Sequence, residues 1–557
     1  MEKLFSVTLK NRDDLEDFYT EMSSKGFRLH MKRPISRNTN YYMTQEQANE
    51  LKKDSRVIDV ERIDDLFVKE DAIYNNTPYT KNGAFYKTGS LSVTDFQWGH
   101  IHAGSASQIG KGSFGSGGST GKKTTSVDVF NNGKHVDVVI VDQSMAYDSE
   151  EWKSPSSGNS RFVQYQWFNE LNSFVTSIDD DGVDPPTGNV TYRQNSAESN
   201  PHGQHVGGTI AGQYYGWARE ANIYNLAILG DGFASGQDIN GWLYYDFLRA
   251  FHLHKAVNPV TGRRNPTITQ HSYGGIFYLN PEEEVLSFSK LNSVSYRGTT
   301  YNSGNPGPSG WTQAGVITDF GVRFDLTTYP AYHAGLGADI QDAIDDGVII
   351  VASAGNDNLL VADPSSSDWN NSITWEYDTG DIRTKYYNRG HYPAMPDTDA
   401  IIVGALGNDS DFKRADFSMF GPGVDVFAPG VRILSCYGNT GYNDTKYSAG
   451  NYYALGSGTS MAGPQVTGVV ATLATAKPRF TNSDAKGYLQ RHCKDNDMTF
   501  NSSGGSFNDD TSQHGSPNKY LLSKNPRPTS GMIEDVKGER KTSGMTFPRR
   551  ATLNYVA

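Results

Sequence analysis

Three segments of the sequence each place one reactive side chain beside a glycine-rich turn. Asp142 ends the apolar run V-D-V-V-I-V-D (136–142), His202 opens H-G-Q-H-V-G-G-T-I-A-G, and Ser460 lies in G-S-G-T-S-M-A-G-P before an apolar helix. These three residue types together can perform nucleophilic catalysis. A serine hydroxyl attacks a carbonyl only when a histidine accepts its proton, and an aspartate holds that histidine in the required tautomer.

The order of these residues along the chain, aspartate then histidine then serine, is the order found in subtilisin. The three blocks resemble those of the subtilisin-like serine peptidases, the subtilases, and G-T-S-M-A-G-P (458–464) is the most specific of them. A structural serine or a hydrogen-bonded histidine is the commoner interpretation of either residue alone. Three blocks in the family's order favour catalysis, so we expect a serine endopeptidase.

The resemblance also implies an oxyanion hole, the set of hydrogen-bond donors that stabilises the tetrahedral intermediate. It points to Asn356 in A-S-A-G-N-D-N (352–358), directly after an apolar run that we interpret as a buried strand. The side-chain amide of Asn356 would act together with the backbone N–H of Ser460. An asparagine in a turn after a strand is ordinary by itself, and the match of the whole block implies this role.

Substrate contacts follow from the same resemblance. Q-H-S-Y-G-G (270–275) resembles the family's edge segment, which pairs with the extended backbone of a substrate. We expect the backbone contacts from Ser272, Tyr273 and Gly274. One wall of the pocket for the side chain before the cut would be formed by Ala352, Ser353, Ala354 and Gly355. Their small size predicts a medium or large apolar side chain in that pocket.

The chain departs from the family pattern beside two of the catalytic residues. Gln143 and Ser144 follow the aspartate where the family usually has Ser or Thr and then Gly. Gln204 and Gly207 stand in the histidine block where the family usually has Thr and Ala. We expect these departures to change the turn geometry and the hydrogen bonding beneath the histidine, and so to lower turnover.

An acidic segment lies between the aspartate and histidine blocks. S-I-D-D-D-G-V-D (177–184) places four aspartates around a glycine, and such a density of carboxylates suits an oxygen-ligated Ca²⁺. Many subtilases carry structural calcium. The spacing is not that of an EF-hand, and a solvated acidic loop is the alternative. The expected ligands are Asp179, Asp181 and Asp184, and no cofactor is expected for the chemistry.

Strands and helices alternate from about residue 127 to 522. The runs 136–141, 347–354 and 400–406 are short, β-branched and bounded by turn residues, as buried parallel strands are. The helical pattern at 338–347 ends in a glycine directly before a strand, which is typical of α/β proteins. The resemblance implies a three-layer α/β/α domain with a mostly parallel sheet over residues 127–522. The Tyr- and Asn-rich segments 277–335 and 358–397 are interpreted as insertions on its surface.

Residues 1–70 predict a separate small α/β domain. F-S-V-T-L (5–9) alternates as a strand, Thr44 and Gln47 form a capping box before a helix, and R-V-I-D-V-E (56–61) is a closing strand. The module resembles the ferredoxin-like inhibitory propeptides of subtilases, which assist folding and bind in cis; the alternative is an unrelated small domain. The resemblance implies a zymogen that Ser460 cuts between about residues 65 and 98.

Two further segments lack a clear pattern. Residues 71–126 form a Gly/Ser-rich connector that we expect to be flexible. Residues 523–557 form a basic tail in which T-S-G-M occurs twice, at 529–532 and 542–545. We interpret the tail as a solvated, flexible segment, with a docking element for a larger particle as the alternative.

Composition excludes several classes of protein. The 557 residues carry 50 Lys and Arg against 62 Asp and Glu, a formal net charge of −12, so nucleic-acid binding is disfavoured. No run approaches the length of a membrane-spanning helix, so no membrane partner is expected. The two cysteines, Cys436 and Cys493, match no metal-ligand spacing, although one disulfide between them stays open.

The first residues show no apolar secretory signal. We therefore expect synthesis in the cytoplasm, followed by retention there or by delivery as part of a virion or other particle. The expected enzyme is a monomer that acts on polypeptides. Two rivals stay open, namely a catalytically idle subtilase fold that serves as a structural or binding component, and an esterase or acyltransferase with the same triad.

Overall fold

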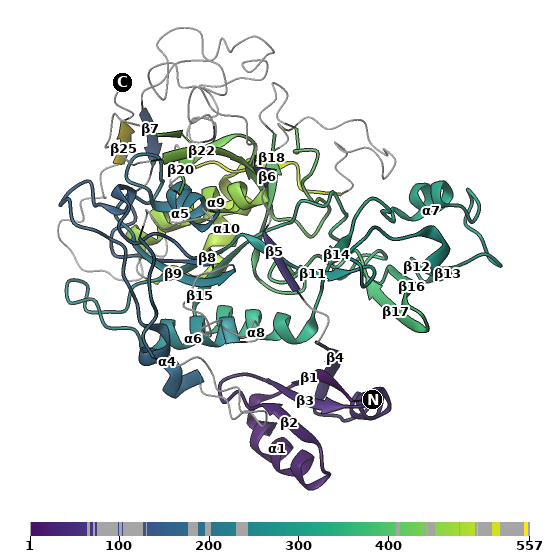
Figure 1. The fold of residues 1–557 in the computed structure, drawn as a ribbon. Coiled ribbons are helices and arrows are strands. Elements are labelled where there is room, and N and C mark those ends of the chain that lie inside the picture. The colour runs from purple at the N-terminus through teal and green to yellow at the C-terminus, as the bar shows by residue number, and fades with distance from the viewer. Residues whose placement is uncertain are drawn as a thin grey trace.

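The computed structural model shows a large α/β unit, a small α/β unit attached to one of its helical faces, and a further sheet that projects from the large unit (Figure 1). Residues 2–63 form the small unit, and the large unit begins after them. The structure describes residues 2–63, 67–70, 73–74, 99, 103, 126–129, 131–175, 188–194, 202–229, 243–407, 413–438, 442–443, 452–477, 479–495, 498, 515–523 and 551–554.

The central sheet of the large unit is built from buried apolar strands. β8 (Asp137–Gln143) and β15 (Val348–Ser353) are buried at every residue, which is typical of parallel strands covered on both faces. Among the described residues the sheet has eight strands in the order β23, β24, β19, β18, β15, β10, β8, β9. Neighbouring strands are parallel except β23 and β24, which are antiparallel. The other bounds are β9 (Asn222–Leu229), β10 (Thr267–His271), β18 (Ile401–Leu406), β19 (Val426–Pro429), β23 (Lys494–Asp495) and β24 (Lys519–Tyr520).

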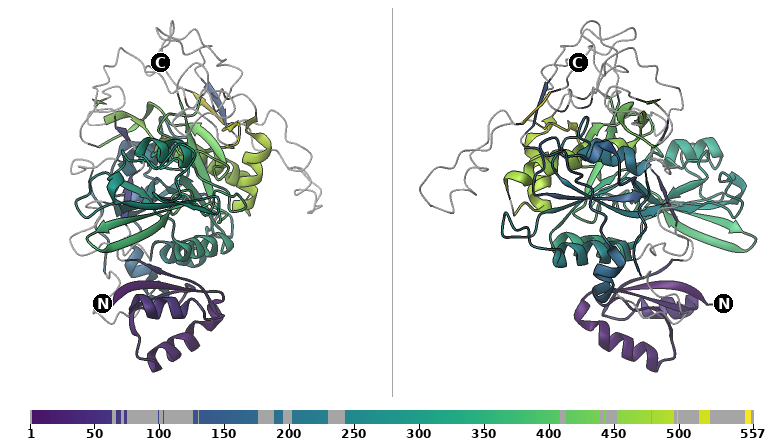
Figure 2. Two further views of the ribbon diagram at one scale, coloured as in Figure 1. Left: turned by 90° about the vertical axis from the view of Figure 1, so that its right-hand side faces the viewer. Right: turned by 60° about the vertical axis from the view of Figure 1, so that its left-hand side comes forward.

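Successive side chains of β8 enter two different cores, because residues of a strand point alternately to its two faces. Val138 and Ile140 pack with helices α5 (His202–Ala211), α9 (Thr459–Ala476) and α10 (Asn482–His492). Val139 and Val141 pack with helices α4 (Trp167–Val175), α6 (Tyr244–His254) and α8 (Ala334–Asp345). Figures 1 and 2 show these two helical layers on opposite faces of the sheet, which confirms the three-layer α/β/α architecture.

The small unit is a four-stranded antiparallel sheet with two helices. Its strands lie in the order β2, β3, β1, β4, and with the chain order β1-α1-β2-β3-α2-β4 this is the ferredoxin-like arrangement. The predicted capping box is confirmed, since Thr44 Oγ1 accepts the N–H of Gln47 and Gln47 Oε1 accepts the N–H of Thr44. The bounds are β1 (Lys3–Leu9), α1 (Leu15–Ser24), β2 (Arg28–Met31), β3 (Asn38–Met43), α2 (Gln45–Leu51) and β4 (Val57–Arg62).

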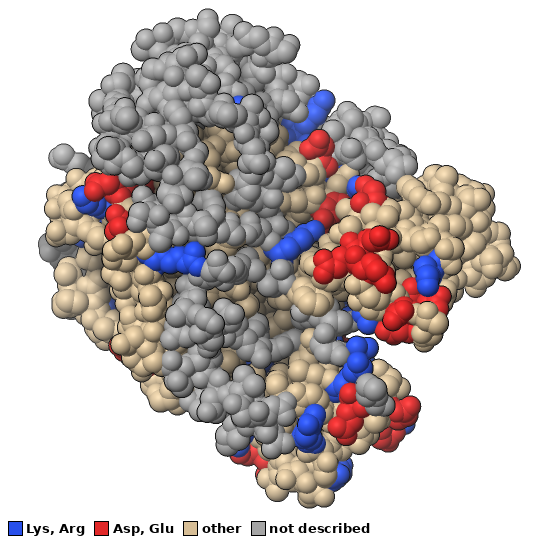
Figure 3. All heavy atoms as spheres, viewed as in Figure 1, with Lys and Arg blue, Asp and Glu red and all other residues tan. Residues whose placement is uncertain are grey.

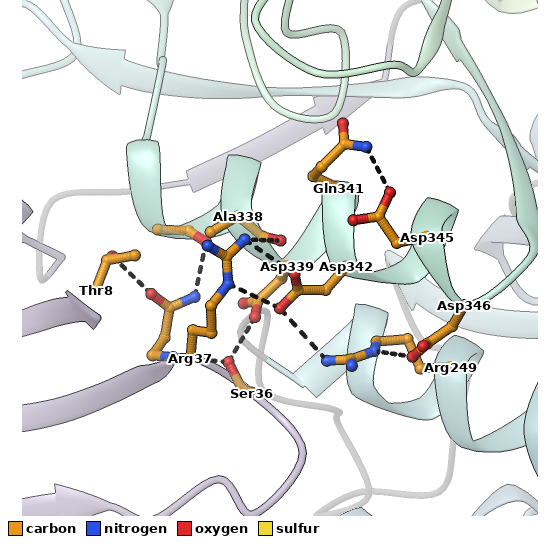
Figure 4. Close-up of polar contacts among 12 residues, drawn as sticks. Thr8, Ser36, Arg37, Arg249, Ala338, Asp339, Gln341, Asp342, Asp345 and Asp346 are labelled. Carbon is orange, nitrogen blue, oxygen red and sulfur yellow. Dashed lines mark hydrogen bonds and ion pairs between the residues drawn. The ribbon is translucent and has the colours of Figure 1, made fainter. Parts of the chain in front are cut away.

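The small unit docks on helices α6 and α8 through buried charges. Arg33 is fully buried, and its guanidinium pairs with Asp246 of α6 at 2.9 Å and with Asp339 of α8 at 2.7 Å. Figure 4 shows the neighbouring contacts, in which Arg37 pairs with Asp342 at 2.9 Å and Ser36 donates to Asp339. One loop of the small unit therefore binds both helices at once.

Segments 277–335 and 358–397 meet to form a separate antiparallel sheet. Its strands lie in the order β13, β12, β16, β17, and it projects from the large unit at the right of Figure 1. The bounds are β12 (Leu291–Tyr296), β13 (Thr299–Tyr301), β16 (Ser372–Asp378) and β17 (Asp381–Tyr386), with helix α7 (Gln313–Phe320) between β13 and β14 (Thr328–Pro330). The two segments, far apart in sequence, thus stabilise each other.

Most of the tail lies outside the described residues, and so do both T-S-G-M segments and the Gly/Ser-rich run 105–123. Four tail residues, β25 (Ala551–Asn554), form an antiparallel pair with β7 (Ser126–Val129). Both cysteines are buried and free, so they form no disulfide. Among the described residues, no helix is long and apolar enough to cross a membrane.

Candidate active site

The carboxyl end of β8 and the first residue of α5 bring Asp142 and His202 together. His202 Nδ1 lies 2.6 Å from Asp142 Oδ1, and both side chains are fully buried. The same carboxylate oxygen accepts the backbone N–H of Gln143 at 2.7 Å. This pair fixes Nδ1 as the donor to the carboxylate, which leaves Nε2 as the nitrogen that can accept a proton.

The two glutamines that depart from the family pattern hold this pair in place. Gln143 Oε1 accepts the backbone N–H of His202 at 3.1 Å, at the N-terminus of α5 where N–H groups need acceptors. Gln204 Oε1 accepts the N–H of Ala146 at 3.1 Å, which ties α5 to the chain after β8. Both glutamines thus take part in the hydrogen bonding beside the histidine, and their effect on turnover stays a prediction.

Two glycines of the histidine block permit the close approach of α5 to β8. A Cβ on Gly203 would lie 2.6 Å from the carbonyl oxygen of Gln143, a contact that backbone atoms cannot relieve. A Cβ on Gly207 would lie 2.4 Å from Cε of Met145, the end of a flexible side chain. Gly207, another departure from the family pattern, therefore makes room for Met145.

The histidine block contains a second histidine with a different environment. His205 Nε2 lies 3.0 Å from the carbonyl oxygen of Ile433 in β20 (Ile433–Cys436) and 3.2 Å from that of Ala454 in β22 (Tyr452–Ser457). Burial lowers the pKa of His205 to about 4, so the ring is neutral at physiological pH. His205 joins α5 to these strands, whereas His202 pairs with the aspartate.

Ser460 lies at the first turn of α9, directly after β22 and a glycine turn. Gly458 has φ 152° and ψ 164°, a conformation that only glycine adopts readily, and it turns the chain from the strand into the helix. Ser460 is buried, and its hydroxyl donates to the carbonyl oxygen of Ser272 at 3.0 Å. The Ser272 hydroxyl donates in return to the carbonyl oxygen of Ser460 at 3.1 Å.

Asn356 lies beside Ser460 and is oriented by Thr459. Asn356 Oδ1 accepts the backbone N–H of Thr459 at 2.9 Å and its hydroxyl at 3.0 Å. Thr459 Oγ1 accepts the N–H of Gly355 at 3.1 Å. Because the amide oxygen faces Thr459, the amide nitrogen, a hydrogen-bond donor, points away from Thr459.

The predicted substrate residues lie around Ser460. Ser272 follows β10 and exchanges the two hydrogen bonds with Ser460, while Tyr273 and Gly274 begin strand β11 (Tyr273–Tyr278). The predicted pocket wall lies at the end of the neighbouring strand β15 and just beyond it. All four of its residues are buried, namely Ala352, Ser353, Ala354 and Gly355.

Two short strands of this chain pair with the strands next to Ser272 and Ser460. β5 (Phe67–Glu70) pairs antiparallel with β11, with Lys69 opposite Gly274 and Glu70 opposite Tyr273. β6 (Ile73–Tyr74) pairs antiparallel with β22, with Ile73 opposite Ser457. Ser272, the residue directly before β11, is the one bonded to Ser460. The last residue of β5 and the first residue of β6 therefore each pair with a residue close to Ser460.

Comparison with protein-family models gives a match to the subtilase family, Peptidase S8, over residues 133–515. This chain belongs to the subtilase family. The match covers every strand of the central sheet except the last, and it includes the aspartate, histidine and serine blocks. Members of the family act on polypeptides and need no cofactor for the chemistry.

Curated relatives match parts of the chain. An alkaline proteinase of Hapsidospora chrysogena is 26% identical over 291 residues, which is 52% of this chain and 46% of the relative. Subtilisin BL of Lederbergia lenta is 32% identical over 166 residues, which is 28% of this chain and 56% of the relative. The chain thus spans about half the length of these two relatives.

Among solved structures, fervidolysin from Fervidobacterium pennivorans, a keratinolytic enzyme related to subtilisin, aligns with a TM-score of 0.50 at 19% identity. The alignment covers 95% of this chain and 62% of fervidolysin. At this identity the likeness shows the subtilase fold.

The structure does not test the predicted calcium ligands. Asp179, Asp181 and Asp184 lie outside the described residues, and within the described part no group of three or more His, Cys, Asp or Glu side chains could hold a metal ion. Calcium on this loop stays a prediction.

Sequence reasoning missed three contributors to the site. It placed the small domain at residues 1–70 and a connector from residue 71, and it named neither the pairing of β5 with β11 nor that of β6 with β22. It also gave no role to Thr459, which orients Asn356, or to Asp357, which contacts β5. G-T-S in the serine block was a usable signal for Thr459, whereas two- and four-residue strands have no periodicity to detect.

Proposed function

We propose that this subtilase is a serine endopeptidase in which Asp142, His202 and Ser460 form the catalytic triad. The observation that carries the proposal is the buried pair of Asp142 and His202, held at 2.6 Å at the start of α5, a helix that packs against α9, whose first turn carries Ser460. Asn356 and the backbone N–H of Ser460 are proposed as the oxyanion hole.

The proposed reaction follows from these positions. The Ser460 hydroxyl turns from the carbonyl of Ser272 to His202 Nε2, gives up its proton and attacks the peptide carbonyl carbon. The carbonyl oxygen becomes an oxyanion that accepts hydrogen bonds from Asn356 and the Ser460 N–H. The C–N bond then breaks as His202 returns the proton to the leaving amine. Water, deprotonated by His202, hydrolyses the acyl-enzyme and restores Ser460.

The first substrate is proposed to be the chain itself, cut between Glu70 and Ile73. β5 pairs with β11 and β6 pairs with β22, and main-chain pairing of this kind is how an extended peptide binds a sheet edge. The sequence predicted a cleavage site between about residues 65 and 98, and this proposal restricts it to the three bonds between Glu70 and Ile73. After cleavage, β5 stays paired with β11 while the small unit remains docked, so the small unit would act as an inhibitor in cis.

The test is the intact mass and the N-terminal sequence of the purified wild type and of Ser460→Ala, incubated side by side. Wild type should lose the small unit and gain a new N-terminus at residue 71, 72 or 73, whereas Ser460→Ala should keep full length. Ser365→Ala, at an exposed serine, is the matched control and should process like wild type.

Two outcomes would overturn parts of this proposal. If wild type and Ser460→Ala both keep full length, self-processing is wrong, and hydrolysis of unfolded protein added in trans then decides between a peptidase and an idle scaffold. If Ser460→Ala is cut as fast as wild type, another protease cuts the chain. Hydrolysis of small esters without hydrolysis of protein would indicate an esterase.

A further inference from the structure

One side chain of β5 is held by an ion pair. Lys69 lies in β5 opposite Gly274, and its Nζ lies 2.9 Å from Asp357 Oδ1 and 3.4 Å from Thr328 Oγ1. The Asp357 side chain is 11% exposed and the Lys69 side chain 34%. The contact is therefore partly shielded from water, and a partly shielded charge pair is more stabilising than one on an open surface.

Asp357 belongs to the site by position as well as by contact. It directly follows Asn356, the proposed oxyanion donor, and its backbone oxygen accepts a hydrogen bond from Arg323 at 3.4 Å. The guanidinium of Arg323 itself pairs with Asp325 at 2.5 Å. When β5 separates from β11, the Asp357 carboxylate loses the ammonium of Lys69 and is available to another cation.

The surroundings of this position are acidic. Glu282, Glu283 and Glu284 are all exposed and follow the end of β11, the strand with which β5 pairs. Figure 3 shows acidic side chains gathered on this side of the molecule, near the elements that Figure 1 labels β11 and β14. A basic substrate is attracted to such a surface and an acidic one is repelled.

We propose that Asp357 is a specificity residue that selects lysine or arginine at the substrate position paired with Gly274. The inference rests on the proposed endopeptidase function, and Lys69 is then the chain's own example of the preferred residue. The position lies on the N-terminal side of the bond that is cut, because β5 precedes that bond. A neutral side chain there leaves the carboxylate without its partner, and an acidic one places two like charges together.

The test compares peptides as substrates of the processed enzyme. The parent peptide has the sequence of residues 66–75, L-F-V-K-E-D-A-I-Y-N, and its analogues carry Gln or Glu in place of Lys69. For wild type, kcat/KM should fall about three- to tenfold with Gln and further with Glu, mainly through a higher KM. For Asp357→Asn the ratio of the lysine to the glutamine peptide should approach one.

Asp325→Asn is the matched control, because it removes a nearby carboxylate that pairs with Arg323, and it should keep the wild-type ratio. Asp357→Asn can also disturb the adjacent Asn356, but such damage slows both peptides alike and leaves the ratio unchanged. The inference is overturned if wild type and Asp357→Asn show the same preference for lysine.

A second measurement decides the inference even if no peptide is cut and the endopeptidase proposal fails. In full-length Ser460→Ala, hydrogen exchange of the β5 amides reports how firmly the segment is held. Adding Asp357→Asn should speed that exchange about three- to tenfold, while adding Asp325→Asn should not. Equal exchange in the two double variants would refute a role for Asp357 in binding.

Discussion

Replacing Arg33 by leucine should detach the small unit from helices α6 and α8. The Arg33 guanidinium is fully buried and pairs with Asp246 and Asp339, which are fully buried as well. Without Arg33 both carboxylates stay in the interface with no counter-ion from the small unit. Removal of one partner from a buried ion pair typically costs about 3–5 kcal/mol. At about 1.4 kcal/mol per factor of ten, the docking equilibrium should shift on the order of 10²–10⁴-fold.

Lys32→Leu is the matched control, since it removes a cation at the neighbouring position. Lys32 pairs with Glu16 at 2.7 Å, but the side chains are 24% and 71% exposed. Exposed pairs contribute only about 0.2–1 kcal/mol. The assay is hydrogen exchange of the β5 amides in full-length Ser460→Ala, because β5 follows the small unit in the chain and its pairing with β11 should loosen when that unit detaches.

The expected result is a large acceleration of exchange in Arg33→Leu and little change in Lys32→Leu. A triple variant, Arg33→Leu with Asp246→Leu and Asp339→Leu, should recover much of the docking, because apolar residues can replace a complete buried charge cluster at little cost. Equal exchange in Arg33→Leu and Lys32→Leu would falsify the claim that the buried charges hold the small unit.

Three further predictions concern the site and the docking surface. Asn356→Ala should lower kcat about 10²–10³-fold with little change in KM in peptide assays, and a loss below tenfold would argue against an oxyanion role. Gly203→Ala should lower both Tm and activity, because its Cβ would lie 2.6 Å from a backbone oxygen. Gly207→Ala should lower Tm less, since the Met145 side chain that its Cβ meets can move. Thermal unfolding checks this order of stability, and a Gly207→Ala variant as unstable as Gly203→Ala would contradict it. Burial raises the pKa of Glu61 to about 7 in the docked state, whereas the carboxyl of the free unit loses its proton near pH 4–5. The wild-type chain should therefore dock more weakly as pH rises from about 5 to about 7, when it is compared with Glu61→Gln. The comparison with Glu61→Gln is needed because burial lowers the pKa of the adjacent His333 to about 3, which acts in the opposite sense, and equal pH profiles for the two proteins would refute the role of Glu61.

Local patterns in the sequence predicted much of the fold. The β-branched run at 136–141 forms β8, the helix predicted at 338–347 is the second half of α8, and the capping box at Thr44 begins α2. These features depend on residues close together in the chain, such as side-chain periodicity, a cap or a turn glycine. Such signals can be recognised before any tertiary contact is known.

Pairings between distant residues could not be predicted in the same way. β5 and β6 are too short to show alternation, and they exist because β11 and β22 supply their hydrogen-bond partners about 200 and 380 residues later. The Tyr- and Asn-rich segments 277–335 and 358–397 likewise showed weak periodicity. They form strands because each segment supplies the edge that the other one needs.

The sequence by itself determined the identities and the order of the reactive residues, and therefore the family. Only the tertiary structure decided how Thr459 turns Asn356 and which segments pair with β11 and β22. It also decided that Arg33 is a buried contact while Lys32 stays near the surface. The physical reason is that hydrogen-bond geometry and burial depend on which elements pack together, and each of these contacts joins residues that are far apart in the chain.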